Sequence, residues 1–379
     1  MKILISGAGI GGLALAAFLR ESDIECEIVE KCESWEHQGY LIGMWNNGRR
    51  ILGKLRLAEK LDAEADRVRF YSIRDGKGRI LRNYNLHEFY SNFGVALMLL
   101  PRAKLHEWLL SLVDTSQIRM GVTIERIEER SDSVTVTFSD GSAGVYTGVI
   151  GADGINSRVR ELVFDKHIES YTGWRAWYAW IENRFNTPST IVEYIEPKEF
   201  VIVMGCKGKT LAMFVAPADH KIWDKTEGRM EMLKCTFKDE CLLVPEILQK
   251  LREGEIVPTD LADVRMRTWV SGRVALIGDA AHSFGAMAGF GASMALEDAY
   301  VLAGELMKIP RAETVPSALR EYERRRKSRV ENAQHLGERM RSWALVESPK
   351  KRAFINFLMP IIPERYFTAD YFSLLREEI

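Results

Sequence analysis

The chain has 379 residues, of which 46% are hydrophobic and 28% charged, and a formal net charge of −1. This length and composition are typical of a globular protein with two or more domains, and the balanced charge excludes the basic excess of a nucleic-acid-binding protein. The five cysteines are scattered, odd in number and form no C-x-x-C pair. We therefore expect reduced thiols in a cytoplasmic protein, with neither a disulfide framework nor a metal site.

The segment from Ile3 to Leu19 carries no charge and follows Lys2. It is open to three interpretations: a secretory signal, a membrane anchor, or the start of a nucleotide site. Four glycines interrupt it, whereas a signal peptide needs continuous helix formers and a spanning helix needs roughly 20 apolar residues. A strand, a glycine turn, a helix and a second strand explain the pattern best, as one β-α-β unit over residues 2–29.

Residues 7–12 of this unit, Gly-Ala-Gly-Ile-Gly-Gly, match the G-x-G-x-x-G fingerprint of dinucleotide-binding proteins. In that fingerprint Gly7 makes the tight turn, Gly9 lets the backbone approach a pyrophosphate, and Gly12 allows close helix–strand packing. Glu30 ends the second strand, where a carboxylate can bind the adenosine ribose. An ordinary α/β turn with a solvated Glu30 is the alternative, but the context favours an adenine dinucleotide.

Beyond this unit the pattern alternates between helical and strand-like periods. In chain order we expect a helix, a hairpin, a helix and three strands, at 48–61, 68–84, 101–113, 122–128, 134–138 and 145–150. There follow a strand-rich aromatic block at 171–262 with a helical stretch at 231–249, an apolar strand at 273–277, a helix at 292–307 and further helices from 315. A strand-rich block between two α/β segments predicts a nucleotide domain that is discontinuous in sequence.

Two further motifs lie at strand ends. The segment at 151–160 follows a strand and leads into a helix, and the segment at 273–298 contains an apolar strand that ends at Gly278 and Asp279. An aspartate at the carboxyl end of a parallel strand points into the ligand crevice and can accept hydrogen bonds from a ribityl chain. The glycine-rich loop at 285–291 brings backbone N–H groups to a helix N-terminus, which suits a pyrophosphate or the pyrimidine edge of a flavin.

In their order and spacing, these three motifs resemble those of the FAD-dependent aromatic hydroxylases of the p-hydroxybenzoate hydroxylase type, the class A flavoprotein monooxygenases, from Met1 to about Arg329. The resemblance implies an α/β fold: a Rossmann-like FAD-binding domain with an inserted, mainly antiparallel β-sheet substrate domain and C-terminal helices. We expect the FAD-binding domain at 1–67, 94–170 and 265–335, the substrate domain at 68–93 and 171–264, and the C-terminal helical segment at 336–379.

The resemblance also implies how the cofactor is held. Glu30 binds the adenosine ribose, Asp279 the ribityl chain and Arg102 the flavin, and the segment with Asp153 and Arg158 serves both FAD and NAD(P)H. The expected cofactor-binding residues are Gly7, Gly9, Gly11, Gly12, Glu30, Lys31, Arg102, Asp153, Arg158, Gly278, Asp279, Gly289, Gly291 and Ala292. The chain departs from the family pattern in one loop, which bears on the mobility of the flavin ring. Its residues there are Gly285 and Ala286 in place of prolines, and Phe290 in place of a glutamine.

The implied reaction is the hydroxylation of a small aromatic or polycyclic metabolite by a C4a-hydroperoxyflavin, with O2 and either NADPH or NADH. Because the flavin supplies the chemistry, we assign no catalytic residue and expect His282 to be a structural imidazole. An FAD-dependent reductase or dehydrogenase of an isoprenoid fits the same motifs. A flavin-dependent halogenase fits less well, since its G-W-x-W-x-I-P signature is missing, and a non-enzymatic FAD-binding protein fits least. We expect a monomer or homodimer.

An aromatic strand predicts the substrate side. Alternation puts Trp174, Tyr178 and Trp180 on one face, and Arg175 and Trp177 on the other. Packing of the sheet against the FAD-binding domain explains the same aromatics equally well, because large aromatics dominate protein cores. The expected pocket residues are Trp174, Tyr178, Trp180, Met204, Phe214 and Phe284.

The run at 320–329 is strongly charged. Glu321 with Arg325, and Glu323 with Lys327, are i,i+4 pairs, which predicts a solvated helix face.

The apolar segment at 353–363 follows Lys350, Lys351 and Arg352 and is too short to span a bilayer. Docking on an anionic membrane is one interpretation of this pattern. Burial of the same side chains against the protein's own body is worth about 1.5–3 kcal/mol each, so we expect packing and no stable membrane insertion.

Overall fold

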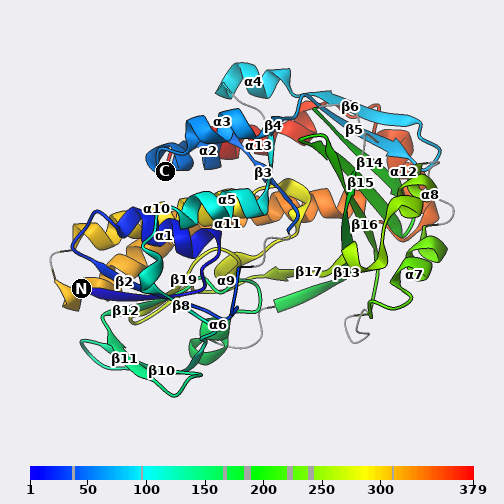
Figure 1. The fold of residues 1–379 in the computed structure, drawn as a ribbon. Helices are drawn as coiled ribbons and strands as arrows, with labels where there is room; N and C mark the ends of the chain where they lie inside the picture. Colours follow the sequence, from blue (N-terminus) through cyan, green and yellow to red (C-terminus); the bar gives the residue numbers. More distant parts are fainter. Residues whose placement is uncertain are drawn as a thin grey trace.

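Two large sheets and the helices between them make up the protein (Figure 1). The computed structural model describes residues 1–35, 39–94, 97–164, 169–182, 189–219, 225–237, 243–309 and 311–379. One continuous hydrophobic core joins the two sheets, since it includes Ile5 of the first sheet, Phe200 of the second and Leu375 near the C-terminus.

The first sheet contains six strands in the order β18-β19-β12-β1-β2-β8. In that order their bounds are Val270–Ser271, Val274–Leu276, Gly148–Gly151, Lys2–Ser6, Glu25–Glu30 and Ile118–Met120. All neighbours pair in parallel except β18 with β19. The strands come from the beginning, the middle and the end of the sequence, as the discontinuous pattern predicts.

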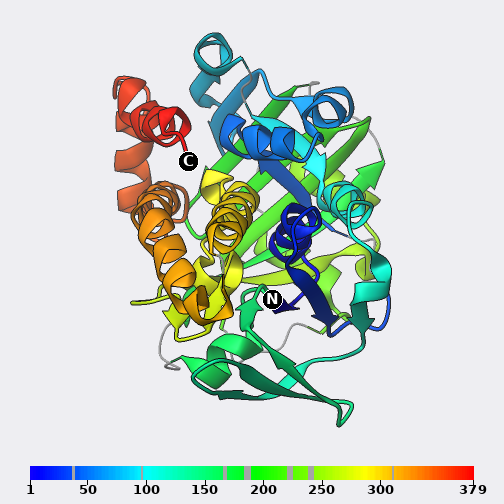
Figure 2. The same ribbon diagram turned by 90° about the vertical axis from the view of Figure 1, so that its left-hand side faces the viewer.

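Helices cover one face of this sheet and a small antiparallel sheet covers the other (Figures 1 and 2). The helical side includes α1 (Ile10–Leu19), which packs against α5 (Arg102–Leu110) and α10 (Gly291–Lys308). The small sheet consists of β9 (Ile124–Glu129), β10 (Val134–Phe138) and β11 (Ala143–Tyr146). The expected β-α-β unit is therefore present, with α10 beside its helix.

The second sheet contains seven strands in the order β17-β13-β16-β15-β14-β5-β6. In that order their bounds are Val257–Val264, Glu169–Glu182, Lys209–Pro217, Glu199–Cys206, Thr190–Glu196, Phe70–Asp75 and Ile80–Asn85. Only β14 with β5 is a parallel pair. One face joins the main core, and the other forms a second core with α7 (Arg229–Thr236) and α8 (Leu243–Lys250).

Shorter elements link the two sheets. A three-stranded sheet pairs β3 (Leu41–Met44), β7 (Met98–Pro101) and β4 (Asp66–Arg67). The remaining α-helices are α2 (Asn46–Lys54), α3 (Ala58–Glu64), α4 (His87–Phe93), α6 (Arg158–Val163), α9 (Asp279–His282), α11 (Val315–Ala344), α12 (Pro349–Leu358) and α13 (Arg365–Arg376). The single helix predicted at 48–61 is wrong: Arg56, with φ +60°, is left-handed and separates α2 from α3. Among the described helices, none has the length and apolar character to cross a bilayer.

Candidate cofactor and substrate site

The loop between β1 and α1 contains glycines in three different environments. Gly7 has φ +103°, and a side-chain carbon there would lie 2.5 Å from the carbonyl oxygen of Ala152. At Gly12 such a carbon would lie 2.0 Å from the Gly7 carbonyl oxygen, whereas at Gly9 no atom lies within 4 Å of that position. The loop therefore has the sharp turn, the close packing and the open backbone that a pyrophosphate needs.

Glu30, the last residue of β2, braces this loop. Its Oε2 accepts the Ala8 N–H at 2.9 Å, and its Oε1 accepts the Cys32 N–H at 3.0 Å. A carboxylate has about four acceptor positions, so both oxygens keep capacity for ribose hydroxyls. Lys31 beside it is exposed. His106 of α5, which the sequence did not single out, places Nε2 2.9 Å from the Ala8 carbonyl oxygen.

The first turn of α10 lies beside this loop. Gly291 opens α10 with no atom within 4 Å of its side-chain position, and Ala292 is half-buried. Side-chain carbons at Gly11 of α1 and at Gly278 would lie 3.7 Å and 3.2 Å from the Ala295 Cβ of α10. The N-termini of α1 and α10 are thus neighbours, and their backbone N–H groups attract anions to one region.

Asp279, Arg102 and Tyr40 lie near one another at the same edge of the sheet, and we call this region the Asp279 recess. Asp279 begins α9 after β19, Arg102 begins α5 after β7, and the Arg102 N–H donates to the Tyr40 carbonyl oxygen at 3.0 Å. Burial raises the pKa of the Asp279 carboxyl, whereas His282 and Arg102 lower it. Burial and the charge of Asp279 also raise the pKa of Tyr40. The Asp279 side chain is nevertheless exposed to solvent.

His282 is fixed behind this recess. Its Nε2 lies 2.5 Å from Asp298 Oδ2, which also accepts the Gly278 N–H at 3.0 Å. Burial alone would raise the pKa of Asp298, but His282 and Arg326 lower this pKa to about 2. His282 thereby holds the strand-to-helix junction that presents Asp279, as a structural imidazole does.

The charged run of α11 is only partly solvated, so the prediction of a solvated face is wrong for two of its arginines. Arg326 and Arg329 are buried, with Arg326 Nη1 2.6 Å and Arg329 Nε 2.8 Å from Glu297 Oε2. Glu297 lies on α10, outside the run, which is why the run alone did not reveal its pairing with the two arginines. Glu321 pairs with Arg324 at 2.6 Å, three residues away.

The segment after β12 uses its own polar groups. Asp153 accepts the Ser157 hydroxyl at 2.5 Å and the Val159 N–H at 3.1 Å. Burial raises the pKa of Asp153, against the effect of Ser157. Arg158 is exposed and pairs with Glu161 at 3.0 Å. Asp153 therefore shapes the loop, whereas the Arg158 side chain extends into solvent.

The altered loop before α10 makes a contact at Gly285 that a proline could not make. The Gly285 N–H donates to Asp263 Oδ1 at 3.3 Å, whereas a proline has no N–H. Gly289 has φ +69°, and Trp45 Nε1 donates to the Ala288 carbonyl oxygen at 3.2 Å. Phe290 is fully buried, with its ring centroid 5.9 Å from that of Trp45 and 5.6 Å from that of Tyr371.

Trp174, Tyr178 and Trp180 of β13 share the face that joins the main core, which confirms the predicted alternation. Tyr178 stacks on Tyr40 with centroids 5.4 Å apart, and Trp180 Nε1 donates to the Gly39 carbonyl oxygen at 2.8 Å. Because Tyr40 also borders the Asp279 recess, this aromatic row reaches the expected cofactor site.

The other expected pocket residues are divided. Met204 lies half-buried on the same face as the aromatic row. Phe214 lies on the opposite face, since it pairs with Trp177 across β13 and β16 and belongs to the second core. Phe284 lies against α11, where a side-chain carbon at Gly337 would be 3.3 Å from its Cδ2. The structure therefore does not bring Phe214 to the row.

Sequence reasoning missed a buried acid on the same face. Glu193 of β14 accepts a hydrogen bond from the Tyr71 hydroxyl. Burial raises the pKa of Glu193 to about 7, against the effects of Tyr71 and Arg352. Among the described atoms, the Tyr84 hydroxyl and two guanidinium nitrogens of Arg352 are buried without a hydrogen-bond partner. The one available indication was a single acid within the apolar strand sequence TIVEYI.

Comparisons with known proteins settle the family. The chain is 29% identical to 2-heptyl-3-hydroxy-4(1H)-quinolone synthase of Pseudomonas aeruginosa (strain UCBPP-PA14), over 96% of this chain and 94% of that protein. It is 30% identical to a 3-amino-4-hydroxybenzoate 2-monooxygenase of Streptomyces platensis, over 93% and 90% of the two chains. Residues 1–336 match the family model of the FAD binding domain. The chain belongs to this family, among the class A flavoprotein monooxygenases.

This FAD-dependent monooxygenase has the expected p-hydroxybenzoate hydroxylase-like fold. Klebsiella pneumoniae HpxO complexed with FAD and uric acid is similar with a TM-score of 0.89 and 25% identity, over 99% of this chain and 97% of that chain. FAD is the cofactor of the present monooxygenase, small molecules are its substrates, and NAD(P)H is the reductant typical of the family. The open backbone at Gly9 and the free acceptor capacity of Glu30 fit an adenine dinucleotide.

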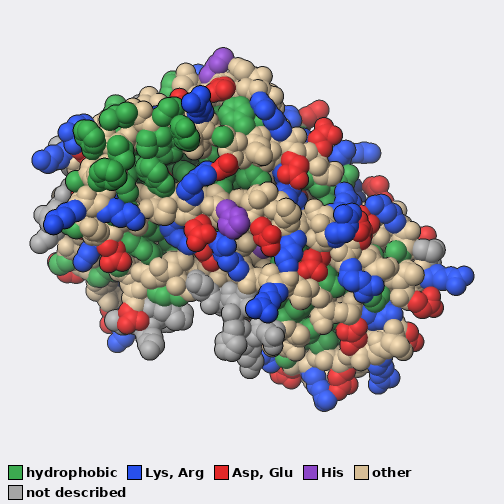
Figure 3. Space-filling view, turned by 180° about the vertical axis from the view of Figure 1, so that it is seen from behind, with side chains coloured by type: hydrophobic (Ala, Val, Ile, Leu, Met, Phe, Trp, Pro, Cys, Tyr) green, Lys and Arg blue, Asp and Glu red, His purple; other side chains and the backbone are tan. Residues whose placement is uncertain are grey.

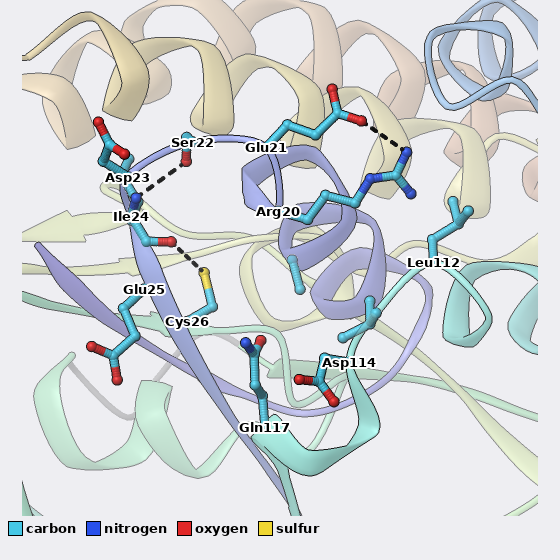
Figure 4. Close-up of a pocket in the computed structure, with 12 residues that line it drawn as sticks. Arg20, Glu21, Ser22, Asp23, Ile24, Glu25, Cys26, Leu112, Asp114 and Gln117 are labelled. Atoms are coloured by element: carbon cyan, nitrogen blue, oxygen red, sulfur yellow. Dashed lines mark hydrogen bonds and ion pairs between the residues drawn. The ribbon is translucent and has the colours of Figure 1, made fainter.

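A surface pocket of the monooxygenase lies at the other end of α1 (Figure 4). Arg20 and Glu21 line it from the end of α1, Cys26 from the start of β2, and Asp114 and Gln117 from the segment before β8. Ligands of such sheets bind at the carboxyl ends of the strands. This pocket borders the amino end of β2 and is therefore separate from the cofactor recess.

Proposed function

We propose that this monooxygenase hydroxylates an aromatic or polycyclic metabolite, with NADPH or NADH as the reductant and O2 as the source of the oxygen atom. The observation that carries the proposal is the stack of Tyr178 on Tyr40, because it joins an aromatic sheet face to the recess of Asp279 and Arg102. Flat aromatic walls favour a flat aromatic ligand. The names of the quinolone and aminohydroxybenzoate relatives point to the same substrate class.

We also propose roles for the residues that face the cofactor. The backbone at Gly9 and Gly291 binds the pyrophosphate, Glu30 the adenosine ribose, Asp279 the ribityl chain, and Arg102 the flavin. When bound, FAD supplies the redox chemistry. We propose that the domain boundaries are those expected from the sequence.

The test is a steady-state assay of the FAD-loaded enzyme with a panel of aromatic acids, quinolones and purines. We expect one or more of them to accelerate NAD(P)H oxidation, with one O2 consumed for each hydroxylated product. Oxidation of NAD(P)H that hydrogenates a substrate without consuming O2 would contradict the proposal and indicate a reductase.

A pair of variants on one strand localises the substrate. Tyr178→Leu should raise the substrate KM by about tenfold, because it removes an aromatic contact and buried area. Trp177→Leu is the matched control, since its side chain faces the second core on the other side of the sheet. Equal effects on KM, after normalisation for FAD content, would argue against this face as the substrate face.

A further inference from the structure

Helix α12 turns apolar side chains outward and a charged one inward. Phe354 and Phe357 are 62% and 69% exposed, and Ile361 just beyond the helix is 64% exposed. Arg352 is 2% exposed, and Ile355 is also buried. The expectation that the apolar segment at 353–363 packs on the protein's own body is therefore wrong for these three large side chains.

This orientation is fixed by contacts on both ends of the helix. Ser348 caps α12 by accepting the Lys351 N–H at 3.4 Å, and Arg352 Nη2 donates to the Ala344 carbonyl oxygen at 2.6 Å. Arg82 of β6 donates from Nη1 to the Met359 and Ile362 carbonyl oxygens at 2.9 and 2.7 Å. Rotation of α12 to bury the phenylalanines would break these bonds, so the outward face is a built feature of the fold.

The outward side chains form a patch that we call the α12 patch: Phe354, Phe357, Ile361 and Tyr366, the last being 63% exposed at the start of α13. Phe354 and Phe357 are three residues apart, so they lie on the same side of α12, and Ile361 follows in the turn after the helix. Figure 3 shows hydrophobic side chains gathered on this face of the molecule, with basic side chains at the margin. Such a patch marks an interaction surface.

The charges beside the patch favour a lipid surface as its occupant. Lys350 and Lys351 are exposed, and Lys350 precedes Phe354 by one helical turn. Arg365 is exposed beside Tyr366, and the exposed Glu347 and Glu364 are the acids closest to these cations in sequence. Apolar side chains with a cationic margin are typical of interfacial helices on anionic membranes.

A second copy of the chain fits this surface less well. Four side chains cover less than the roughly 800 Å² per partner of a standard protein interface.

We propose that the α12 patch docks the enzyme on an anionic membrane, with Phe354, Phe357 and Ile361 in the acyl boundary and Lys350 and Lys351 at the headgroups. The binding is peripheral, in keeping with the lack of a membrane-crossing helix among the described residues. The inward side of α12 carries Arg352, which lies within electrostatic reach of Glu193 on β14 of the second sheet. A docked membrane would therefore be one helix away from that sheet.

Flotation of the FAD-loaded enzyme tests the proposal. We expect co-flotation with vesicles of phosphatidylcholine and phosphatidylserine, and little with phosphatidylcholine alone. The double substitution Phe354→Ser and Phe357→Ser should reduce the bound fraction by about tenfold or more, and Lys350→Glu with Lys351→Glu by several-fold. Val145→Ser, at an exposed apolar residue of β11 far from α12, is the matched control and should float like the unaltered enzyme.

Each other outcome overturns the proposal. It fails if the enzyme does not float with anionic vesicles, or if the phenylalanine variant floats as well as the unaltered enzyme. It also fails if the enzyme is a dimer in solution that the same variant dissociates while vesicle binding is absent. FAD content and NAD(P)H oxidation without vesicles should be unchanged in every variant, so failure of docking is distinguishable from failure of the proposed reaction.

Discussion

The nucleotide edge of the parallel sheet and the C-terminal helices are held by different kinds of contact. At the edge, backbone atoms approach so closely that only glycine fits: the side-chain position of Gly12 lies 2.0 Å from the Gly7 carbonyl oxygen. Around α11, charged side chains distant in sequence are buried together, as in the pair Arg326 and Glu297. We therefore expect the stability of the nucleotide edge to depend on steric fit. The stability of the C-terminal helices should depend on the pairing of buried charges.

The largest effect that we expect comes from adding a methyl group where glycine packs against the backbone. Gly12→Ala would force apart α1 and β1, so we expect poor folding and no bound FAD. Gly9→Ala adds the same methyl group where nothing lies within 4 Å, so the apo protein should fold with an unchanged melting temperature but bind FAD at least about tenfold more weakly. Thermal melting and FAD titration of both variants provide the check. Equal melting temperatures for the two variants would contradict it.

The electrostatic part predicts the next effect. Arg326→Leu removes one buried guanidinium partner from both Glu297 and Asp298, and the loss of one partner of a buried ion pair typically costs about 3–5 kcal/mol. We expect a melting temperature lower by roughly 5 °C or more. Arg324→Leu, on the exposed side of the same helix, is the control and should melt like the unaltered protein. A similar loss in both variants would show that burial of the pair is unimportant.

Asp279 and His282 separate cofactor binding from structure within one short helix. Asp279→Ala removes an acceptor from the recess and should weaken FAD binding by about 1.5–3 kcal/mol. His282→Ala should lower the melting temperature while FAD content is retained, because its ring contacts Asp298 behind the recess. Full FAD content with loss of product formation in His282→Ala would instead assign the imidazole a role in the reaction.

The smallest effect that we expect comes from Glu193, and it appears only as a change of stability with pH. Burial raises its pKa to about 7 in the native state, so the native protein holds this proton more tightly than the unfolded chain. Its contribution to stability is complete below the unfolded pKa and is lost as the pH rises through the folded pKa. Relative to Glu193→Gln, the unaltered protein should lose about 2 kcal/mol between about pH 5.5 and 7. If the stability of the unaltered protein and of Glu193→Gln, measured by thermal melting, changed equally over this pH range, the raised pKa of Glu193 would be refuted.

The sequence predicts a feature well where its cause lies within a few residues. Six residues determine the glycine loop, and alternation along β13 correctly separates Tyr178 from Trp177. Phe214 was wrongly predicted to line the pocket because its face depends on the pairing of two strands. It lies opposite Trp177 in the β13–β16 register, and neither strand alone reveals that register.

The C-terminal helices needed partners from elsewhere in the chain. The burial of Arg326 depends on Glu297 and Asp298 of α10, and the outward face of α12 depends on Arg82 of β6. A polarity pattern indicates which sides a helix has, and the partner decides which side is buried. This is why the fold class and the cofactor loop were predictable, whereas the surface of α12 was not.

The reaction itself provides the most direct test of the account. The FAD-loaded enzyme would be incubated with NAD(P)H, an aromatic compound that accelerates its oxidation, and isotopically labelled dioxygen, and the product analysed by mass spectrometry. We expect each product molecule to carry one labelled oxygen atom on the aromatic framework. A product that has gained or lost hydrogen without labelled oxygen would contradict it.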